Sequence, residues 1–543
     1  MRKPAATDQQ VLVQLPGHSF QHSCFQLLHA MLIFMSSAFS NDSQIKRLRS
    51  SELRILQSKD SIRCQIGVDS QITSRTALDA TSLAHAATVA QPSRKLLQTI
   101  STSLVKSPPT AFSSSLFSPA ATLPSAPPLA TGFIKTFNGK FVSDDCTEHI
   151  FTGWDSWRLV EAANGIANAL PKDSSLLDGK NFVDWLFDYA VAHKLKVVRM
   201  FGFGDVQDGQ GAALESASGV FDEQVFKGID KVLDSAAKHD LKVIIALADN
   251  WKPTDGLSAY AKRCSNGDVD LFWSSTACLS LYQAHVNKVL NRVNSINGLI
   301  YKNDPAIFSW NIFNEPRCSQ DISEDDSCKP GVQGFVDQMA AYIKGIDKNH
   351  MVTVGEEGFF AAGDPAINGN PQGTWSGKTG QDFRGNHMSK NIDFATIHMW
   401  PDNWKDLDSN FISNWLTSHM NVAKQLGKPL ILEEFGREVD ADSDAARDTE
   451  RNPTHVEVYK TVQDSITTGG SLRAAMFWEW FVRPEGESIP GGITSRPYGI
   501  SQFDNTYTGP IQDHANWISQ HPGDKVPGCV PGTQGGAPSK SSG

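Results

Sequence analysis

Two glutamates, each following a short apolar run, are the residues whose types and spacing could do chemistry. Glu315 ends residues 306–315 (AIFSWNIFNE), and Glu434 ends residues 428–434 (KPLILEE). A carboxylate at the carboxyl end of a buried strand lies at the rim of a parallel barrel, where such proteins do their chemistry. Two carboxylates on different strands can flank one glycosidic bond. The two runs therefore predict a site for glycoside hydrolysis, provided that the rest of the chain builds a barrel.

The neighbours of Glu315 fit such a site. Asn314 offers an amide that can bind a sugar hydroxyl, and Pro316 ends the strand because it cannot donate to a ladder. Arg317 could pair with a nearby carboxylate. The alternative interpretation is a glutamate at a strand end that only caps a helix.

The second glutamate has an equally acidic neighbour. Glu433 precedes Glu434, and strand alternation points one of the two into the barrel mouth and the other away. The following glycine, Gly436, permits a turn that a bulkier residue would strain. We prefer Glu434 because Phe435 and Gly436 follow it, although strand geometry alone leaves the choice open.

Polar and aromatic residues lie at the ends of several other apolar runs. His398 and Trp400 are two residues apart, so their side chains share one face of a strand. A single residue of this kind is often structural, but packing alone does not explain so many at equivalent strand ends. The full set of candidates is Arg199, Asn250, Trp251, His398, Trp400 and Trp478.

Short apolar runs alternate with helix-length segments through the main part of the chain. An alternation of strands and helices indicates a parallel sheet. Eight such units predict a (β/α)8 TIM barrel with long loops over residues 131–521. A doubly wound open sheet is the alternative, but no GxGxxG or Walker sequence supports it. The eight runs are 149–154, 195–201, 241–247, 306–310, 351–355, 393–398, 429–432 and 474–478.

The two ends of the chain have a different composition. Residues 24–40 contain an apolar stretch of about a dozen residues, too short for a membrane span, so we interpret residues 1–40 as a signal peptide, with a retained anchor or a plastid transit segment as alternatives. Residues 41–130 are rich in Pro, Ser and Ala, which predicts a disordered linker. Residues 522–543 read as a flexible tail.

The net charge of the chain limits the kinds of partner that it can bind. Residues 1–130 carry 12 Lys and Arg against 6 Asp and Glu, so the rest of the chain has a net charge of -16. An acidic body argues against a nucleic-acid partner and suits a neutral polysaccharide. Nothing in the sequence calls for an obligate protein partner.

The cysteine spacing predicts two disulfides in an oxidising compartment. Cys264 and Cys278 close one short loop, and Cys318 and Cys328 close another. No spacing has the CxxC…CxxC form, so we expect no zinc site.

The sequence resembles glycoside hydrolase family 5, and within it the endo-β-1,4-mannanases of the plant and fungal type. The resemblance runs from about Gly132 to about Ile518, and residues 301–318 are its most specific part. The other matching segments are 249–251, 286–294, 354–360, 392–398 and 432–436.

The resemblance implies a role for each candidate. Glu315 becomes the acid/base and Glu434 the nucleophile of a retaining endo-hydrolase that acts on β-mannan. Trp251 and Trp478 become stacking platforms for sugar rings. The remaining matching positions are Arg199, Asn250, Asn314 and His398. Neither a metal nor an organic cofactor is implied.

Two residues depart from the family's pattern. Trp400 stands where the family usually has a tyrosine whose hydroxyl would bond the nucleophile, and an indole offers only a differently placed N–H. Glu479 stands where a glutamine is common after the strand-end tryptophan, which adds a charge near the cleft.

A retaining mechanism sets geometric and electrostatic requirements. The two carboxyl groups should lie about 5–5.5 Å apart. Glu315 should have a raised pKa, and Arg199 near Glu434 should lower the pKa of that group. Two alternative functions remain. One is a family 5 β-glucanase, because barrel geometry does not separate mannose from glucose, and the other is a non-catalytic polysaccharide-binding barrel, which would be expected to lack one of the carboxylates.

The signal peptide predicts secretion, with membrane anchoring or plastid targeting as alternatives.

Overall fold

The computed structural model describes most of the chain after residue 131 and three short strands before it. The described ranges are 10–14, 53–58, 61–67, 132–165, 181–204, 213–251, 256–318, 327–482 and 498–532, with the first three given as backbone only. The chain divides into two compact units, residues 1–122 and 123–543.

Eight parallel strands form the central sheet of the second unit, and all eight overlap the apolar runs predicted from the sequence. Strands that follow one another in the chain lie side by side, and the first and last of the eight strands in the chain also pair. Their residues are buried on both faces, which is why each strand reads as a nearly continuous apolar run. The strands are β6 (Phe151–Asp155), β7 (Val197–Phe201), β10 (Lys242–Ala246), β11 (Ile307–Asn311), β12 (Met351–Thr353), β13 (Ala395–Met399), β14 (Leu430–Phe435) and β15 (Leu472–Phe477).

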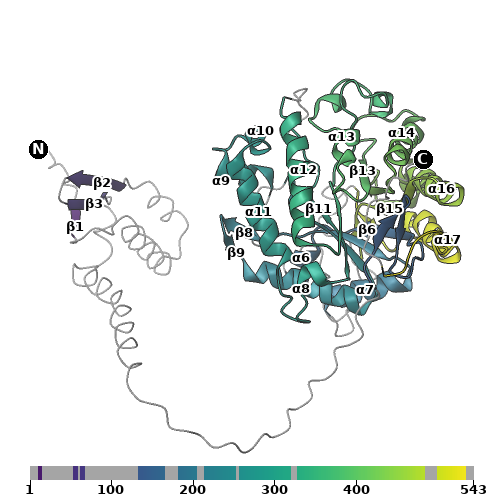
Figure 1. Ribbon diagram of the computed structural model, residues 1–543, viewed down its shortest axis with the longest axis horizontal. Coiled ribbons are helices and arrows are strands. Elements are labelled where there is room, and N and C mark those ends of the chain that lie inside the picture. The colour runs from purple at the N-terminus through teal and green to yellow at the C-terminus, as the bar shows by residue number, and fades with distance from the viewer. Residues whose placement is uncertain are drawn as a thin grey trace, which may run out of the picture. The chain divides into compact units, whose positions relative to one another are not determined.

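The order across the sheet is β12-β11-β10-β7-β6-β15-β14-β13, and hydrogen bonds between its two end strands, β12 and β13, close the barrel. The backbone N–H of Asp393 donates to the carbonyl oxygen of Val352 at 2.8 Å, and the Thr353 hydroxyl donates to that of Phe394 at 3.0 Å. Helices lie outside the strands (Figure 1). The predicted (β/α)8 barrel is therefore confirmed. The longer surrounding helices are α7 (Phe182–Ala192), α8 (Glu223–Lys238), α11 (Thr276–Leu290), α12 (Lys329–Ile346), α14 (Phe411–Leu426), α16 (Asn452–Thr468) and α17 (Gln512–Gln520).

A hairpin that the sequence analysis did not predict closes the amino-terminal end of the barrel. Strands β4 (Lys135–Phe137) and β5 (Lys140–Val142) pair antiparallel. Phe141 of β5 is fully buried, and its ring centroid lies 5.3 Å from those of both Phe308 and Phe394. This end of the barrel is thus filled with packed aromatic side chains, so the opposite, carboxyl end is the one that can hold a site.

Three disulfides fasten the barrel unit. Both predicted pairs, Cys264–Cys278 and Cys318–Cys328, are confirmed. The third joins Cys146 to Cys529, which are 383 residues apart, so it ties the two ends of the unit together.

Serine at both Cys146 and Cys529 should lower the melting temperature by several degrees. In the chain-entropy description, a long closed loop contributes about 5 kcal/mol and a 15-residue loop about 3 kcal/mol. Serine at Cys264 and Cys278, which close a 14-residue loop, is the matched control with the smaller expected loss. Thermal unfolding followed by circular dichroism under non-reducing conditions measures both; equal losses would contradict the loop-length argument.

The amino-terminal unit contains a three-stranded antiparallel sheet in the order β1-β3-β2. Its strands are β1 (Gln10–Gln14), β2 (Leu53–Ser58) and β3 (Ser61–Gly67). The apolar stretch within 24–40 and most of the predicted linker lie outside the described residues, so both interpretations remain predictions. In the part of the chain that the structure describes, no helix is long and apolar enough to cross a bilayer.

Candidate active site

Glu315 lies in the loop that follows β11, in a backbone conformation that is uncommon for a residue with a side chain. Its φ is +51°, and its N–H donates to the carbonyl oxygen of Gly355 at 2.7 Å. Gly355 itself has a φ of +86°, and a Cβ there would lie 2.7 Å from the carbonyl oxygen of Phe313. A glycine after β12 is therefore required to support the loop that presents Glu315.

Glu434 and its neighbour Glu433 both face the interior of the barrel, which corrects the expectation that one of them points away. The pairing register of β14 shifts against both neighbouring strands at this place, so simple alternation does not hold. Glu433 accepts two hydrogen bonds from Nδ2 of Asn311, at 3.0 and 3.2 Å. Glu434 accepts one from Arg199, and of the two carboxylates it is the one that approaches Glu315.

The guanidinium of Arg199 is the hub of the site. Its Nη1 donates to Glu434 and lies 3.3 Å from Oδ1 of Asp155. Its Nε donates to Oδ1 of Asn311 at 2.8 Å, and its Nη2 donates to Oδ1 of Asn314 at 2.5 Å. Arg199 thus joins the ends of strands β6, β7, β11 and β14 and holds a positive charge against the Glu434 carboxylate.

Two donors hold the carboxylate of Glu315. The Nδ1 atom of His398, at the end of β13, lies 2.6 Å from Oε1, and the indole N–H of Trp251 donates to Oε2 at 2.5 Å. The same Nδ1 lies 3.6 Å from Oε2 of Glu434. One oxygen of Glu315 and one of Glu434 lie within 4.8 Å of each other. The structure therefore brings the two predicted glutamates together across the barrel mouth.

The pKa order expected for the two glutamates is reversed in the structure. Burial raises the pKa of Glu434 to about 7 despite the opposing charges of His398 and Arg199. Burial would also raise the pKa of Glu315, but the hydrogen bond and charge of His398, with the charge of Arg317, hold it below its usual value. Burial disfavours the imidazolium of His398, yet the surrounding glutamates raise its pKa to about 10. The reversal arises because the imidazolium lies closer to Glu315 than to Glu434.

Most of the other predicted residues lie beside the two glutamates. The amide of Asn314 accepts from Arg199 and donates to Oδ1 of Asp249 at 2.7 Å, so its orientation is fixed and one N–H remains for a ligand. Asn250 is fully buried, and its backbone N–H donates to the carbonyl oxygen of Asn314 at 3.1 Å. Its predicted contact with sugar remains a prediction.

Trp400 and Trp478 form an aromatic wall beside the nucleophile position. Their ring centroids are 5.9 Å apart, and Tyr498 lies 5.0 Å from Trp400. A Cβ on Gly436 would lie 2.7 Å from Trp400, so glycine lets the indole approach the backbone beyond Glu434. The Tyr498 hydroxyl donates to Asp402 at 2.7 Å. Within the described residues, the one hydrogen bond to the Glu434 carboxylate comes from Arg199, and none comes from a tyrosine.

Sequence reasoning missed several buried polar residues of the site. Three of them, Asp155, Asn311 and Asp249, lie at or just after the end of a strand, as the predicted residues do. Their place at strand ends could therefore have identified them from the sequence. Asp155 has a pKa well above its usual value, because it is buried and Glu434 and Glu433 lie near. Nothing in the local sequence singled out Tyr498, which comes from a distant segment.

Two groups of side chains could present ligand atoms to a metal ion within the described ranges. In one, the sulfurs of Cys318 and Cys328 are already joined as a disulfide. In the other, Glu315, His398 and Glu434 converge, but the Nδ1–Oε1 contact of 2.6 Å occupies the space between two of them. The chemistry of this donor set is that of an acid–base cluster.

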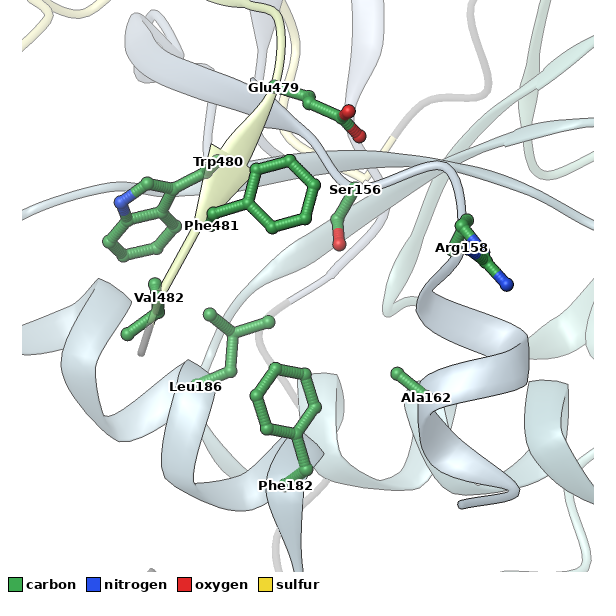
Figure 2. Close-up of a pocket in the computed structure, with 9 residues that line it drawn as sticks. All are labelled: Ser156, Arg158, Ala162, Phe182, Leu186, Glu479, Trp480, Phe481 and Val482. Carbon is green, nitrogen blue, oxygen red and sulfur yellow. The ribbon is translucent and has the colours of Figure 1, made fainter. Parts of the chain in front are cut away.

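One pocket is lined by neither Glu315 nor Glu434. Figure 2 shows Trp480 and Phe481 of strand β16 (Trp480–Phe481) above Phe182 and Leu186 of α7, with Glu479 at one edge. Two of its lining residues, Ser156 and Glu479, directly follow Asp155 and Trp478 in the chain. The remaining lining residues are Ser156, Arg158, Ala162 and Val482.

Comparisons with known proteins agree with this geometry. Residues 132–487 match the family model described as glycoside hydrolase family 5 beta-mannosidase-like. The chain is 36% identical over 306 residues to mannan endo-1,4-beta-mannosidase 1 of Oryza sativa subsp. japonica, covering 54% of this chain and 68% of that protein. It is 33% identical over 362 residues to mannan endo-1,4-beta-mannosidase 1 of Arabidopsis thaliana, covering 64% of this chain and 82% of that one. The crystal structure of the endo-1,4-beta-mannanase from Rhizomucor miehei superposes with a TM-score of 0.55 at 26% identity, over 72% of this chain and all of that chain.

Proposed function

The chain belongs to the β-mannosidase-like proteins of glycoside hydrolase family 5, and we propose that it is a retaining endo-hydrolase of the β-1,4-mannosidic linkages of mannan, glucomannan or galactomannan. The observation that carries this proposal is the approach of Glu315 and Glu434 to within 4.8 Å at the mouth of a parallel barrel. The names of its relatives, which are mannan endo-1,4-beta-mannosidases, give the substrate.

In the proposed first step, the Glu434 carboxylate attacks the anomeric carbon while Glu315 donates a proton to the departing glycosidic oxygen. The bond to the leaving sugar breaks as the bond to Glu434 forms, giving a glycosyl ester. In the second step, Glu315 takes a proton from water, which attacks the same carbon and releases Glu434. Arg199 orients Glu434 and favours its ionised form, and the remaining N–H of Asn314 can hold a sugar hydroxyl.

The spacing of the carboxyl groups supports retention. One oxygen of each carboxylate lies within 4.8 Å of the other, which is compatible with the roughly 5–5.5 Å between carboxyl groups in a double displacement; an inverting enzyme keeps these groups about 6.5–9.5 Å apart to admit water. The contacts of Glu315 also suit the second step, since His398 and Trp251 both hold it as an anion that can accept a proton. The two carboxyl groups titrate as a pair that shares one proton in the active form, and the first step requires that proton on Glu315.

The proposal is tested by product release from galactomannan and from carboxymethylcellulose. Mannooligosaccharides of several lengths are the expected products from galactomannan. Release of cello-oligosaccharides alone would keep the mechanism and replace mannan by glucan as the substrate. Binding of either polysaccharide without cleavage would point to a carbohydrate-binding barrel instead.

The pH dependence should respond to the charge on His398. The active form needs one proton on the glutamate pair, so kcat/KM should fall as pH rises through about 7, where the last proton leaves. Replacing His398 with asparagine keeps a donor near Glu315 but removes the positive charge that favours the doubly ionised pair. The alkaline limb should therefore move up by about one pH unit or more, measured as kcat/KM on mannohexaose; a downward shift would contradict the assigned charge.

We also propose that the protein acts outside the cell, as a secreted enzyme on cell-wall mannan. The three disulfides support an oxidising compartment, and residues 24–40 supply the apolar part of a signal peptide. Fractionation of the intact protein between medium, membranes and plastids checks this, and recovery with membranes would indicate a retained anchor.

A further inference from the structure

A series of contacts leads from Glu315 to Arg317, a buried arginine that makes no hydrogen bond to Glu315 but whose charge helps to lower the pKa of that group. The first link is Trp251, whose indole N–H donates to Glu315. This tryptophan is 40% exposed, so packing alone does not fix its ring. Besides its hydrogen bond to Glu315, the ring is held by the guanidinium of Arg317, which lies over the indole at 5.1 Å from the ring centroid.

The guanidinium is held in one place from its other sides. It lies 5.4 Å from the ring of Phe359 and 5.8 Å from that of Trp375, and both its Nε and its Nη2 donate to the carboxylate of Glu357, the former at 2.6 Å. A paired donor fork and a stacked plane together fix both the position and the tilt of an arginine. Arg317 is only 3% exposed.

At the end of this series of contacts that is remote from Glu315, side chains are hydrogen-bonded to backbone groups. Gln381 donates to Glu357 at 2.8 Å, and its side-chain oxygen accepts the N–H groups of Gly358 and Phe359 at 3.1 and 3.3 Å. The carbonyl oxygen of Arg317 accepts from the indole of Trp273 at 3.0 Å. The indole of Trp251, the carboxylate of Glu357 and the amide of Gln381 thus all have hydrogen-bond partners along this route.

From this arrangement we infer that Arg317 is a positioning residue for Glu315 and acts through the indole of Trp251. Glu315 has a strained φ and two donors, and the donor from Trp251 is the one that Arg317 holds in place. Without the guanidinium, the exposed indole turns away, and Glu315 loses one of the two contacts that define its carboxylate plane. This inference rests on the proposed function, because it concerns the same acid/base group.

The test is the replacement of Arg317 with methionine, which keeps the length and removes the charge and the planar stack. A misplaced acid/base should lower kcat on mannohexaose about 10- to 100-fold, with KM changed less than about twofold. Trp251→Phe keeps a ring and removes the N–H, so it should show a similar loss. The double variant should lose no more than the larger single loss, since both act on one route.

Other results would overturn the inference. A raised KM with unchanged kcat would make Arg317 a sugar contact, and additive losses in the double variant would separate it from Trp251. If the Arg317 variant unfolds, Trp251→Phe still tests whether the indole N–H supports kcat, and an unchanged kcat in that variant would overturn the inference. Arg384→Met is the matched control. Arg384, on helix α13 (Phe383–Met388), forms an ion pair with Asp364 at 2.7 Å, so this variant should leave kcat unchanged. A wild-type protein inactive on both polysaccharides would refute the proposed function rather than this inference.

Discussion

Alanine at Glu434 should reduce hydrolysis of mannohexaose by more than about 10⁴-fold while the fold and the melting temperature are kept. The reason is that the glycosyl ester can no longer form, and loss of a nucleophile of this kind removes nearly all of the chemical rate. KM should change little, because Glu434 acts at the reacting carbon rather than on remote sugars. The measurement is the rate of mannooligosaccharide release, with thermal unfolding as the check on folding.

Glu433 provides the matched control for this result. It is the adjacent glutamate, equally buried, and it accepts hydrogen bonds from Asn311. Glu433→Gln should keep that contact and retain measurable activity, whereas Glu434→Gln should be as inactive as the alanine variant. If Glu433→Gln were the inactive one, the two assignments would have to be exchanged.

The strands of the barrel were predictable because each has to be apolar on both faces. All eight runs became strands, including Lys242–Ala246 and Met351–Thr353, and the residues at their ends gathered at one mouth as parallel topology requires. That is why Glu315, Arg199 and His398 could be placed near Glu434 from strand ends alone.

Features set by contacts between distant segments were not predictable in this way. The register shift in β14, which turns both Glu433 and Glu434 inward, depends on how two neighbouring strands pair. The packing of Phe141 against Phe308 and the Cys146–Cys529 disulfide each join segments that are far apart in the chain. No local sequence pattern in either segment indicates its partner. The pKa order depends on a difference of about 1 Å between the two distances from His398, which no sequence pattern encodes.

Alanine at Glu315 should have a different kinetic signature from alanine at Glu434. Loss of the acid should lower kcat on mannohexaose about 10²- to 10⁴-fold. A mannobioside with a good leaving group such as 2,4-dinitrophenolate should still form the glycosyl ester quickly, because that leaving group needs no proton. Hydrolysis of the ester should then be slow, since no base activates water, and sodium azide should accelerate turnover by replacing the water.

The configuration of the azide product distinguishes the roles of the two glutamates. In the Glu315 variant, azide attacks the ester on Glu434 from the opposite face, so two inversions give a β-mannosyl azide. In the Glu434 variant, azide occupies the space left by the carboxylate and attacks the β-linked substrate directly, so one inversion gives an α-mannosyl azide. Nuclear magnetic resonance of the products determines the anomeric configuration of the mannosyl azide. A β product from the Glu434 variant would mean that another residue is the nucleophile, and Glu433, which lies 3.5 Å from Nε of Arg199, would be the next to replace.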